Sequence, residues 1–301
     1  MNQFDALQKV LPSLQMIESE PMKRHTTFKV GGPCSLMLLP KNMEELRGAI
    51  AFLKERGFPY AVIGKGSNLL VADKGTHLVI IKLAENFASM QKIDHCRIEA
   101  DAGVSLAKLA AFAAEENLSG LAFAAGIPGT VGGGVFMNAG AYGGELSAVI
   151  ERVTVLTPAG EPAEFTNEQC ALGYRKSFFS EHQAYTIVRA VFSLTPGKKD
   201  EIHAEMADLA KRRREKQPLE YPSAGSTFKR PEGAFAGTLI EAAGLKGFTI
   251  GGAQVSKKHA GFLINTGGAT AADVQNLIST VQEKVKEQSG FFLECEVRFL
   301  D

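Results

Sequence analysis

Two glycine-rich stretches carry the clearest binding chemistry in the chain. Residues 126–145 read GIPGTVGGGVFMNAGAYGGE and hold eight of the 31 glycines, with no charge before the closing glutamate. Residues 64–70 read GKGSNLL and follow the apolar run 60–63. Glycine has no Cβ and adopts positive φ, so successive N–H groups can converge on an anion such as a pyrophosphate. The two stretches together predict one large phosphate-bearing ligand.

A membrane span and a plain connection are the two simpler interpretations of these stretches. Residues 117–144 contain no Asp, Glu, Lys or Arg, and about 20 apolar residues can span a bilayer. Nine glycines with Pro128 and Asn138 argue against a spanning helix. A plain connection is the other alternative, but long uncharged loops in compact domains are usually functional. Residues 64–70 alone are weak evidence for a dinucleotide-binding loop, because position 69 is leucine where the dinucleotide fingerprint has glycine.

Three further patches combine cations, hydroxyls and carboxylates. Residues 173–179 read GYRKSFF and place an arginine among aromatic residues, which suits a bidentate grip on a carboxylate or phosphate. Residues 222–231 read PSAGSTFKRP, a loop with hydroxyls and cations between two prolines. Residues 291–299 alternate strictly, so a strand there would put Glu294, Glu296 and Arg298 on one face.

Composition and motifs narrow the function class. The 33 basic and 33 acidic side chains cancel, so nothing points to nucleic acid or an anionic membrane as the main partner. The simplest interpretation of the basic run 211–214 is a solvated helix face. The alternative is that these cations contribute to binding a substrate phosphate. Hydrolase elbow, Walker, kinase and H-E-x-x-H motifs are missing from the sequence. Among the six scattered histidines, only His259, beside Lys257 and Lys258, is a candidate to face a ligand, and ordinary packing is the simpler interpretation.

The four cysteines are scattered without metal or disulfide spacing. We therefore expect no metal site and a reducing, cytoplasmic setting. The first 20 residues intersperse charges with apolar residues, which predicts a short amphipathic helix and not a secretory signal.

Helix and strand signals alternate along the chain. Apolar residues at helical spacing predict helices over 43–53, ended at Gly57, and over 105–116. Thr270 opens a capping box and a third predicted helix. Apolar, β-branched runs predict strands over four ranges: 60–63, 77–83, 149–156 and 185–194. The polar, turn-rich residues 195–200 predict a domain boundary.

The glycine stretches and the three patches, in this order and spacing, resemble the UDP-N-acetylenolpyruvoylglucosamine reductase family of peptidoglycan synthesis. The resemblance runs from residues 26–32, TTFKVGG, to residues 293–299, LECEVRF. It implies an α+β fold: a two-lobed FAD-binding domain of the vanillyl-alcohol-oxidase type over 1–197, with lobes of about 1–70 and 71–197, and a smaller α+β substrate domain over 198–301. It also implies reduction of UDP-N-acetylglucosamine enolpyruvate to UDP-N-acetylmuramate, with NADPH as co-substrate and no nucleic-acid partner or membrane insertion.

The resemblance assigns roles to individual residues. The catalytic arginine, proton-donating serine and catalytic glutamate fall on Arg175, Ser226 and Glu296. The implied cofactor-binding residues are Gly64, Lys65, Gly66, Ser67, Asn68, Gly126, Pro128, Gly129, Thr130, Val131, Gly132, Asn138, Ala139 and Gly140. The implied substrate-binding residues are Tyr174, Arg175, Lys216, Gly225, Lys229 and His259.

Departures from the family pattern refine these expectations. One subgroup carries a tyrosine on an insertion that covers the substrate, whereas here Leu194 runs straight into Thr195, as in the shorter type. Arg230 replaces an asparagine found after the lysine of the serine loop in some members. Residues 64–70 and 126–145 contain no His or Cys, so FAD is expected to bind non-covalently. The alternatives are an FAD-dependent oxidase of the same superfamily and a non-enzymatic nucleotide-binding or cell-wall assembly module.

Overall fold

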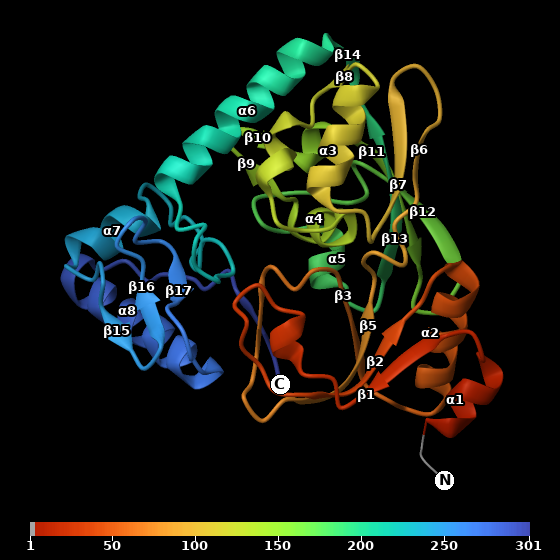
Figure 1. The fold of residues 1–301 in the computed structure, drawn as a ribbon, viewed down its shortest axis with the longest axis horizontal. Coiled ribbons are helices and arrows are strands. Elements are labelled where there is room, and N and C mark those ends of the chain that lie inside the picture. The colour runs from red at the N-terminus through yellow and green to blue at the C-terminus, as the bar shows by residue number, and fades with distance from the viewer. Residues whose placement is uncertain (1–3) are drawn as a thin grey trace. The chain divides into compact units, whose positions relative to one another are not determined.

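A computed structural model describes residues 4–301 and divides them into two compact units (Figure 1). The first unit contains the described residues up to Glu18 together with Leu36–Lys65 and Leu78–Lys211. The second contains Ser19–Ser35, Gly66–His77 and Arg212–Asp301. Both units combine helices with sheets, so the α+β class predicted from the sequence is confirmed.

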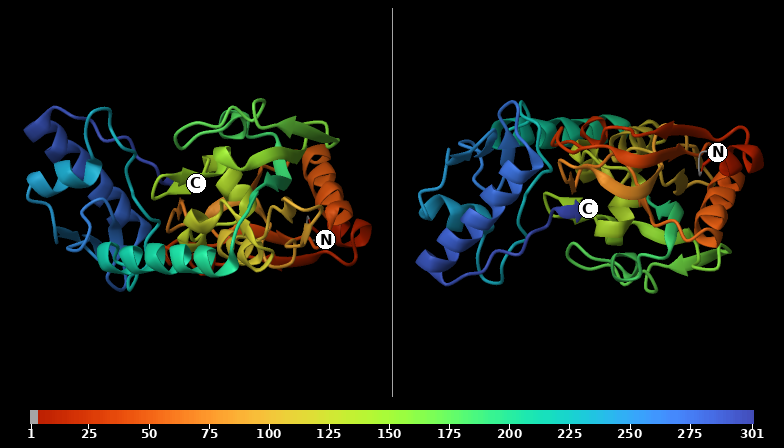
Figure 2. Two further views of the ribbon diagram at one scale, coloured as in Figure 1. Left: turned by 90° about the horizontal axis from the view of Figure 1, so that it is seen from above. Right: turned by 90° about the horizontal axis from the view of Figure 1, so that it is seen from below.

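A four-stranded sheet and the helix beside it form one end of the first unit's core. Its order is β1 (Gln15–Glu18), β2 (Cys34–Leu39), β5 (Thr76–Lys82), β3 (Tyr60–Ile63), with β3 and β5 parallel. Helix α2 (Met43–Glu55, orange in Figure 2) buries Leu46, Ile50 and Leu53 in the same apolar cluster as the sheet. Asn42 caps its start. Gly57 at φ 67° follows its end, as predicted.

A five-stranded antiparallel sheet forms the rest of this core. Its order is β12 (Pro162–Thr166), β11 (Ile150–Leu156), β13 (Thr186–Ser193), β7 (Arg97–Asp101), β6 (Met90–Lys92). Helices α3 (Leu106–Glu115) and α4 (Val131–Met137) share its apolar cluster. The predicted strands over 149–156 and 185–194 and the helix over 105–116 are confirmed within one residue at each end.

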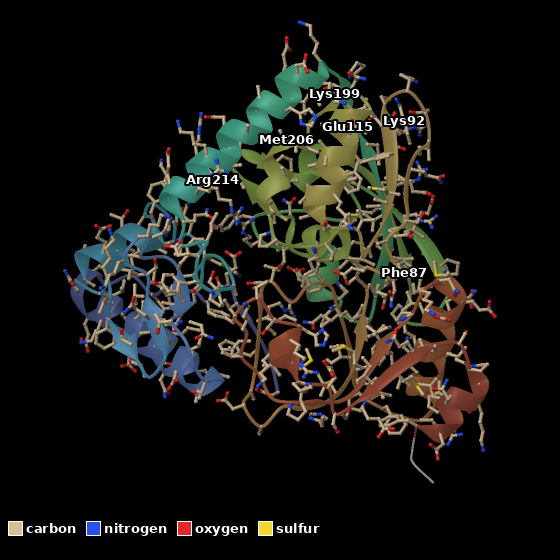
Figure 3. The ribbon with its side chains drawn as sticks, in the orientation of Figure 1. Phe87, Lys92, Glu115, Lys199, Met206 and Arg214 are labelled. Atoms are coloured by element: carbon tan, nitrogen blue, oxygen red, sulfur yellow. The ribbon has the colours of Figure 1, made fainter. Side chains whose placement is uncertain are left out.

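Short elements complete the first unit. They are α1 (Asp5–Val10), β8 (Leu118–Ser119), η2 (Ala122–Gly126), β9 (Gly140–Ala141), β10 (Gly144–Glu145), η3 (Leu146–Ala148), α5 (Phe178–Glu181) and β14 (Thr195–Pro196). The expected N-terminal helix is short, because β1 follows it within the first 20 residues. Helix α6 (Lys199–Lys216) is tied to α3, where Glu115 accepts hydrogen bonds from Lys199 at 2.6 Å and pairs with His203 at 3.1 Å (Figure 3).

The second unit is smaller and has its own core. Its elements are η1 (Met22–Arg24), β4 (Leu69–Val71), α7 (Ala236–Ala242), β15 (Thr249–Ile250), β16 (Ala253–Val255), β17 (Leu263–Asn265), α8 (Ala271–Ser289) and β18 (Arg298–Leu300). Helix α8 begins with the predicted capping box at Thr270. Its apolar face packs against β15 and β16 (Figure 1). Strand β18 pairs in parallel with β4, which brings the C-terminal segment beside residues 69–71.

The predicted strand over 291–299 is wrong for most of its length. Only Arg298–Leu300 forms a strand, and upstream of it the segment makes a single bridge, between Cys295 and Phe228. The alternation still predicts part of the burial, since Leu293 is fully buried and Val297 is 4% exposed. A side-chain pattern indicates which residues face a core, but a strand also needs a continuous backbone partner.

Asp73 stabilises the start of α8, which yields a first prediction. Its carboxylate accepts the backbone N–H groups of Ala271 at 2.7 Å and Ala272 at 3.0 Å. Asp73→Ala should therefore lower the free energy of unfolding by about 1 kcal/mol, because it removes acceptors and a negative charge from a helix N-terminus. Urea unfolding measures this, with Lys74→Ala as the exposed neighbouring control. Equal stability of the two variants would contradict the capping role.

Candidate active site

The loop after β3 presents free backbone donors. Gly66 adopts φ 61°, and a Cβ there would lie 2.0 Å from the carbonyl oxygen of His25, so only glycine fits. Among the hydrogen bonds of residues 4–301, none is donated by the N–H groups of Gly66, Ser67 or Asn68. Consecutive amide donors without protein acceptors form an anion-binding concavity. Residues 66–68 therefore fit the phosphate-binding role predicted for this loop.

The second glycine stretch is built differently. In the first unit, Val131 donates to Val104 at 2.8 Å and Gly132 donates to Ala102 at 2.9 Å, so these two amides are already engaged. Glycines of both stretches permit close packing. A Cβ on Gly64 would lie 2.2 Å from Thr130 Oγ1, and one on Gly132 would lie 2.9 Å from Ala102 Cβ. Any ligand contact in this stretch must use other atoms than these two amides.

Asn138 holds the end of α4 in place. It adopts a left-handed conformation, φ 42°, and its side chain is 1% exposed. Its Nδ2 donates to Gly173 O at 3.1 Å, and its Oδ1 accepts Ser147 N–H at 2.9 Å. The side chain thus fixes residues 138–140 against the segment that carries Arg175. Cofactor binding by Gly126, Pro128, Gly129, Asn138, Ala139 and Gly140 stays a prediction.

Arg175 lies at the tip of a tight hairpin. Gly173 and Lys176 exchange backbone hydrogen bonds of 3.0 and 3.2 Å, which leaves Tyr174 and Arg175 as the two turn residues. Arg175 adopts φ 55°, where glycine is normally required. One guanidinium nitrogen, Nη2, donates to Gly140 O at 3.3 Å, and the guanidinium carbon lies 5.5 Å from the Tyr174 ring centroid. Backbone strain of this kind is typical of functional sites.

The serine loop and the glutamate segment lie side by side in the second unit. Gly225 at φ 78° precedes Ser226, which is exposed. Glu296 N–H donates to Thr227 O at 2.8 Å, and Lys229 N–H donates to Glu294 O at 2.9 Å. Thr227 itself is fully buried and accepts Leu263 N–H through its hydroxyl. The structure therefore brings Ser226 and Glu296 onto adjacent backbone segments, while Arg175 belongs to the first unit.

Charged neighbours modify this site. The Lys229 ammonium forms an ion pair with the Glu294 carboxylate. Asn68 Nδ2 donates to Glu296 O at 2.9 Å, so the predicted cofactor loop and the glutamate segment are directly connected within one unit. Burial lowers the pKa of Arg298.

Burial also raises the pKa of the Cys170 and Cys295 thiols to about 11 each, so neither is a thiolate nucleophile at neutral pH.

His259 and Lys216 have different surroundings. The Nδ1 of His259 accepts Gly261 N–H at 3.1 Å, which leaves a proton on Nε2 of the neutral ring. Burial lowers the pKa of His259, which favours the neutral ring, and a neutral ring with this hydrogen bond donates through Nε2. Lys216 is exposed at the end of α6. Ligand contacts by either residue stay predictions.

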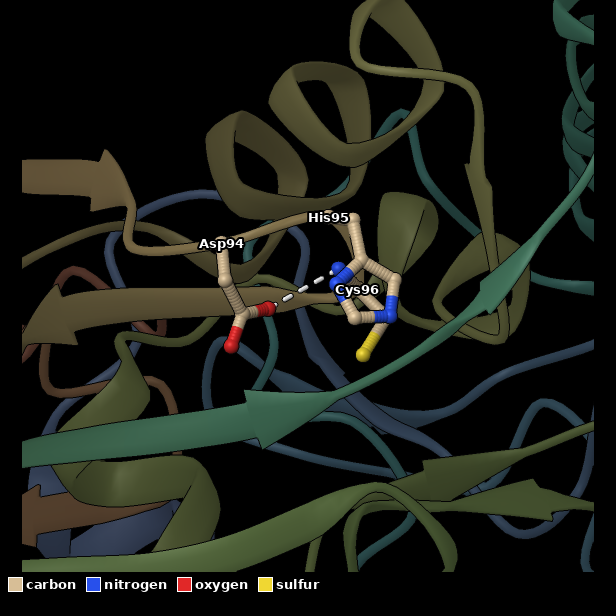
Figure 4. A group of neighbouring side chains, drawn as sticks. All are labelled: Asp94, His95 and Cys96. Carbon is tan, nitrogen blue, oxygen red and sulfur yellow. Dashed lines mark hydrogen bonds between the residues drawn. The ribbon is translucent and has the colours of Figure 1, made fainter.

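One group of potential metal ligands occurs among residues 4–301. Asp94, His95 and Cys96 follow β6, and their ligand atoms lie within 4.8 Å of one another (Figure 4). The Asp94 carboxylate already accepts the N–H groups of Cys96 and Arg97 and the Arg97 Nε at 2.6 Å. These hydrogen bonds lower the pKa of Asp94 to about 2. Asp94 is thus engaged in closing a turn, and the expectation that no metal takes part stays a prediction.

Within the described residues, no helix is both long and apolar enough to cross a membrane. The long uncharged stretch over 117–144 forms β8, η2, α4 and β9, separated by turns.

Comparison with known proteins covers nearly the whole chain. A family model described as an FAD binding domain matches residues 34–166, and one described as the UDP-N-acetylenolpyruvoylglucosamine reductase C-terminal domain matches residues 217–300. The reductase of that name from Syntrophomonas wolfei is 50% identical over 288 residues, 96% of each chain. That of Agathobacter rectalis is 50% identical over 301 residues, covering 96% of this chain and 95% of the relative. The crystal structure of the reductase from Thermus caldophilus matches with a TM-score of 0.80 and 36% identity, over 96% of this chain and 99% of that one.

Proposed function

The chain belongs to the UDP-N-acetylenolpyruvoylglucosamine reductase family, and from this premise we propose that Arg175, Ser226 and Glu296 carry out its reaction. The activity is the NADPH-dependent, FAD-mediated reduction of UDP-N-acetylglucosamine enolpyruvate to UDP-N-acetylmuramate, a step of peptidoglycan synthesis. When bound, FAD supplies hydride transfer from NADPH to the enolpyruvyl double bond. We place this activity in the cytoplasm, as part of cell-wall biogenesis, cell shape and division.

The observation that carries the catalytic assignment is the left-handed backbone of Arg175. A non-glycine residue at φ 55° costs roughly 1 to 3 kcal/mol, and the tight hairpin with Gly173 and Lys176 maintains it. Reduction of the enolpyruvyl group places negative charge on the carbon beside the carboxylate. A guanidinium fixed before the reaction stabilises that charge without having to reorganise. Arg175 is held in this way by its turn and by Gly140.

Ser226 and Glu296 complete the proposed chemistry. The developing carbanion needs a proton, and an exposed hydroxyl on a loop fixed by Gly225 and Thr227 is placed to donate it. Lys229 lies three residues away and supports the hydroxyl electrostatically, although its ion pair with Glu294 reduces that effect. Glu296, held beside Thr227, would stabilise the enol oxygen through a shared proton.

The flavin contacts are proposed from the chain's own groups. Free N–H donors of residues 66–68 suit a pyrophosphate, and neither glycine stretch carries a His or Cys for a covalent link. Non-covalent FAD binding over 1–197 and substrate binding over 198–301 remain the proposed division. The boundary between the compact units falls inside α6, and residues 19–35 and 66–77 join the second unit. The proposed ranges therefore describe which ligand each part binds, and they differ from the ranges of the two compact units.

Steady-state kinetics separate this function from its alternatives. The purified chain should oxidise NADPH only when the UDP-linked enolpyruvyl substrate is present, and mass spectrometry should find a product two hydrogens heavier. Peroxide formation with oxygen as acceptor and no such product would favour the oxidase alternative. A protein without bound flavin and without turnover would favour a non-enzymatic module.

A further inference from the structure

Thr27 lies in a rigid turn of the second unit. Lys29 N–H donates to Thr26 O at 3.2 Å, which closes the turn around Thr27 and Phe28. The Thr26 hydroxyl donates to Val30 O at 2.9 Å, and Asn265 Nδ2 donates to Phe28 O at 3.0 Å. Phe28 itself is fully buried. The backbone that carries the Thr27 side chain is therefore held by hydrogen bonds at Thr26 and at Phe28.

Within residues 4–301, the Thr27 hydroxyl has no hydrogen-bond partner. Its oxygen is shielded from solvent, and among the described residues nothing accepts from it or donates to it. Buried hydroxyls are nearly always hydrogen-bonded, because desolvation without a partner costs free energy. A buried hydroxyl without a partner on a fixed turn indicates that its partner is a bound molecule.

The surroundings of this hydroxyl point to an anion. Thr27 N–H donates to Gly66 O at 3.3 Å, and a Cβ on Gly66 would lie 2.0 Å from the carbonyl oxygen of His25. Thr27 is thus bonded to the loop whose residues Gly66, Ser67 and Asn68 have free N–H groups. Three amide donors and one hydroxyl donor, all without an acceptor in the described part of the chain, match a group with several acceptor oxygens.

We propose that the Thr27 hydroxyl donates a hydrogen bond to a phosphate oxygen of the bound dinucleotide, beside the amides of residues 66–68. This inference rests on the proposed FAD binding and adds a residue to which the sequence analysis assigned no role. Thr27 occurs in the TTFKVGG segment, but nothing in that pattern distinguishes it from Thr26. Their difference is structural, because the Thr26 hydroxyl donates to Val30 O, whereas the Thr27 hydroxyl has no partner among the described residues.

The test compares Thr27→Val with Thr27→Ser and Thr26→Val in the full-length chain. Titration with FAD, followed by quenching of flavin fluorescence, should show that Thr27→Val weakens binding about 10- to 100-fold, the range for one hydrogen bond to a charged group. Thr27→Ser should bind within about threefold of wild type, because it retains the hydroxyl.

Thermal unfolding without FAD provides a second readout. Thr27→Val should melt at or above the wild-type temperature, since it removes a buried hydroxyl that has no partner. Thr26→Val should melt lower, since it breaks the bond to Val30. Unchanged FAD affinity in Thr27→Val, or a lower melting temperature without FAD, would overturn the inference while leaving the proposed function intact. A wild-type chain that binds no FAD would overturn both.

Discussion

Ser226→Ala is expected to slow oxidation of the reduced flavin by substrate about 10²- to 10⁴-fold, while NADPH still reduces the flavin at nearly the wild-type rate. The range is that of losing a positioned general acid, and it corresponds to roughly 3 to 5 kcal/mol of activation free energy. Only the second half-reaction should suffer, because only that half protonates the substrate. Rapid mixing of each half-reaction, followed by flavin absorbance, measures the two rates separately.

A matched control lies in the same loop. Ser223→Ala removes a hydroxyl between the same two prolines, so it should leave both half-reactions near wild type. A turn serine with only a structural role would cost about 1 kcal/mol of stability and affect both halves alike. Equal slowing of both halves by Ser226→Ala, or simple unfolding of that variant, would remove Ser226 from the mechanism.

Arg175→Ala is expected to lower kcat/KM for the enolpyruvyl substrate by at least about 10²-fold while FAD stays bound. Removal of one preorganised group that stabilises developing negative charge typically costs this much. Arg175→Lys should recover little of the activity, since an ammonium cannot reproduce the bidentate fork of a guanidinium. Lys176→Ala, which removes the neighbouring exposed cation, serves as the control.

Arg175→Gly separates loss of the guanidinium from damage to the fold. Glycine adopts φ 55° without strain, so this variant should unfold with a free energy equal to or up to about 1 kcal/mol above that of wild type. Its activity should nevertheless be lost. Full activity in this variant, or loss of FAD from it, would contradict the assignment of Arg175 to the substrate.

The local elements were largely predictable from the sequence. Gly57 and Thr270 end and begin helices by chemistry that depends on a few neighbouring residues. Apolar, β-branched runs correctly predicted β11 and β13, because each of these strands has partner strands along its length. Strict alternation failed to predict a strand over 291–297, where the backbone partner is limited to one bridge at Phe228.

Long-range features could not be predicted in this way. Residues 19–35 and 66–77 join the C-terminal unit, which no local pattern indicates. The left-handed conformation of Arg175 is imposed by a hairpin whose sequence places no glycine at that position. Glycine content also could not show that the amides of Val131 and Gly132 are already hydrogen-bonded within the protein, since a glycine-rich sequence predicts only that a loop can bind an anion. The resemblance identified the candidate residues, and the coordinates distinguish the groups that are free to bind.

The most direct test of the account is the anaerobic visible spectrum of the purified full-length chain, recorded alone, after NADPH, and after addition of UDP-N-acetylglucosamine enolpyruvate. We expect a yellow protein that bleaches with NADPH and regains its colour with the substrate, and denaturation should release intact FAD. A colourless protein, FMN, a covalently attached flavin, or colour that returns only when oxygen is admitted would contradict it.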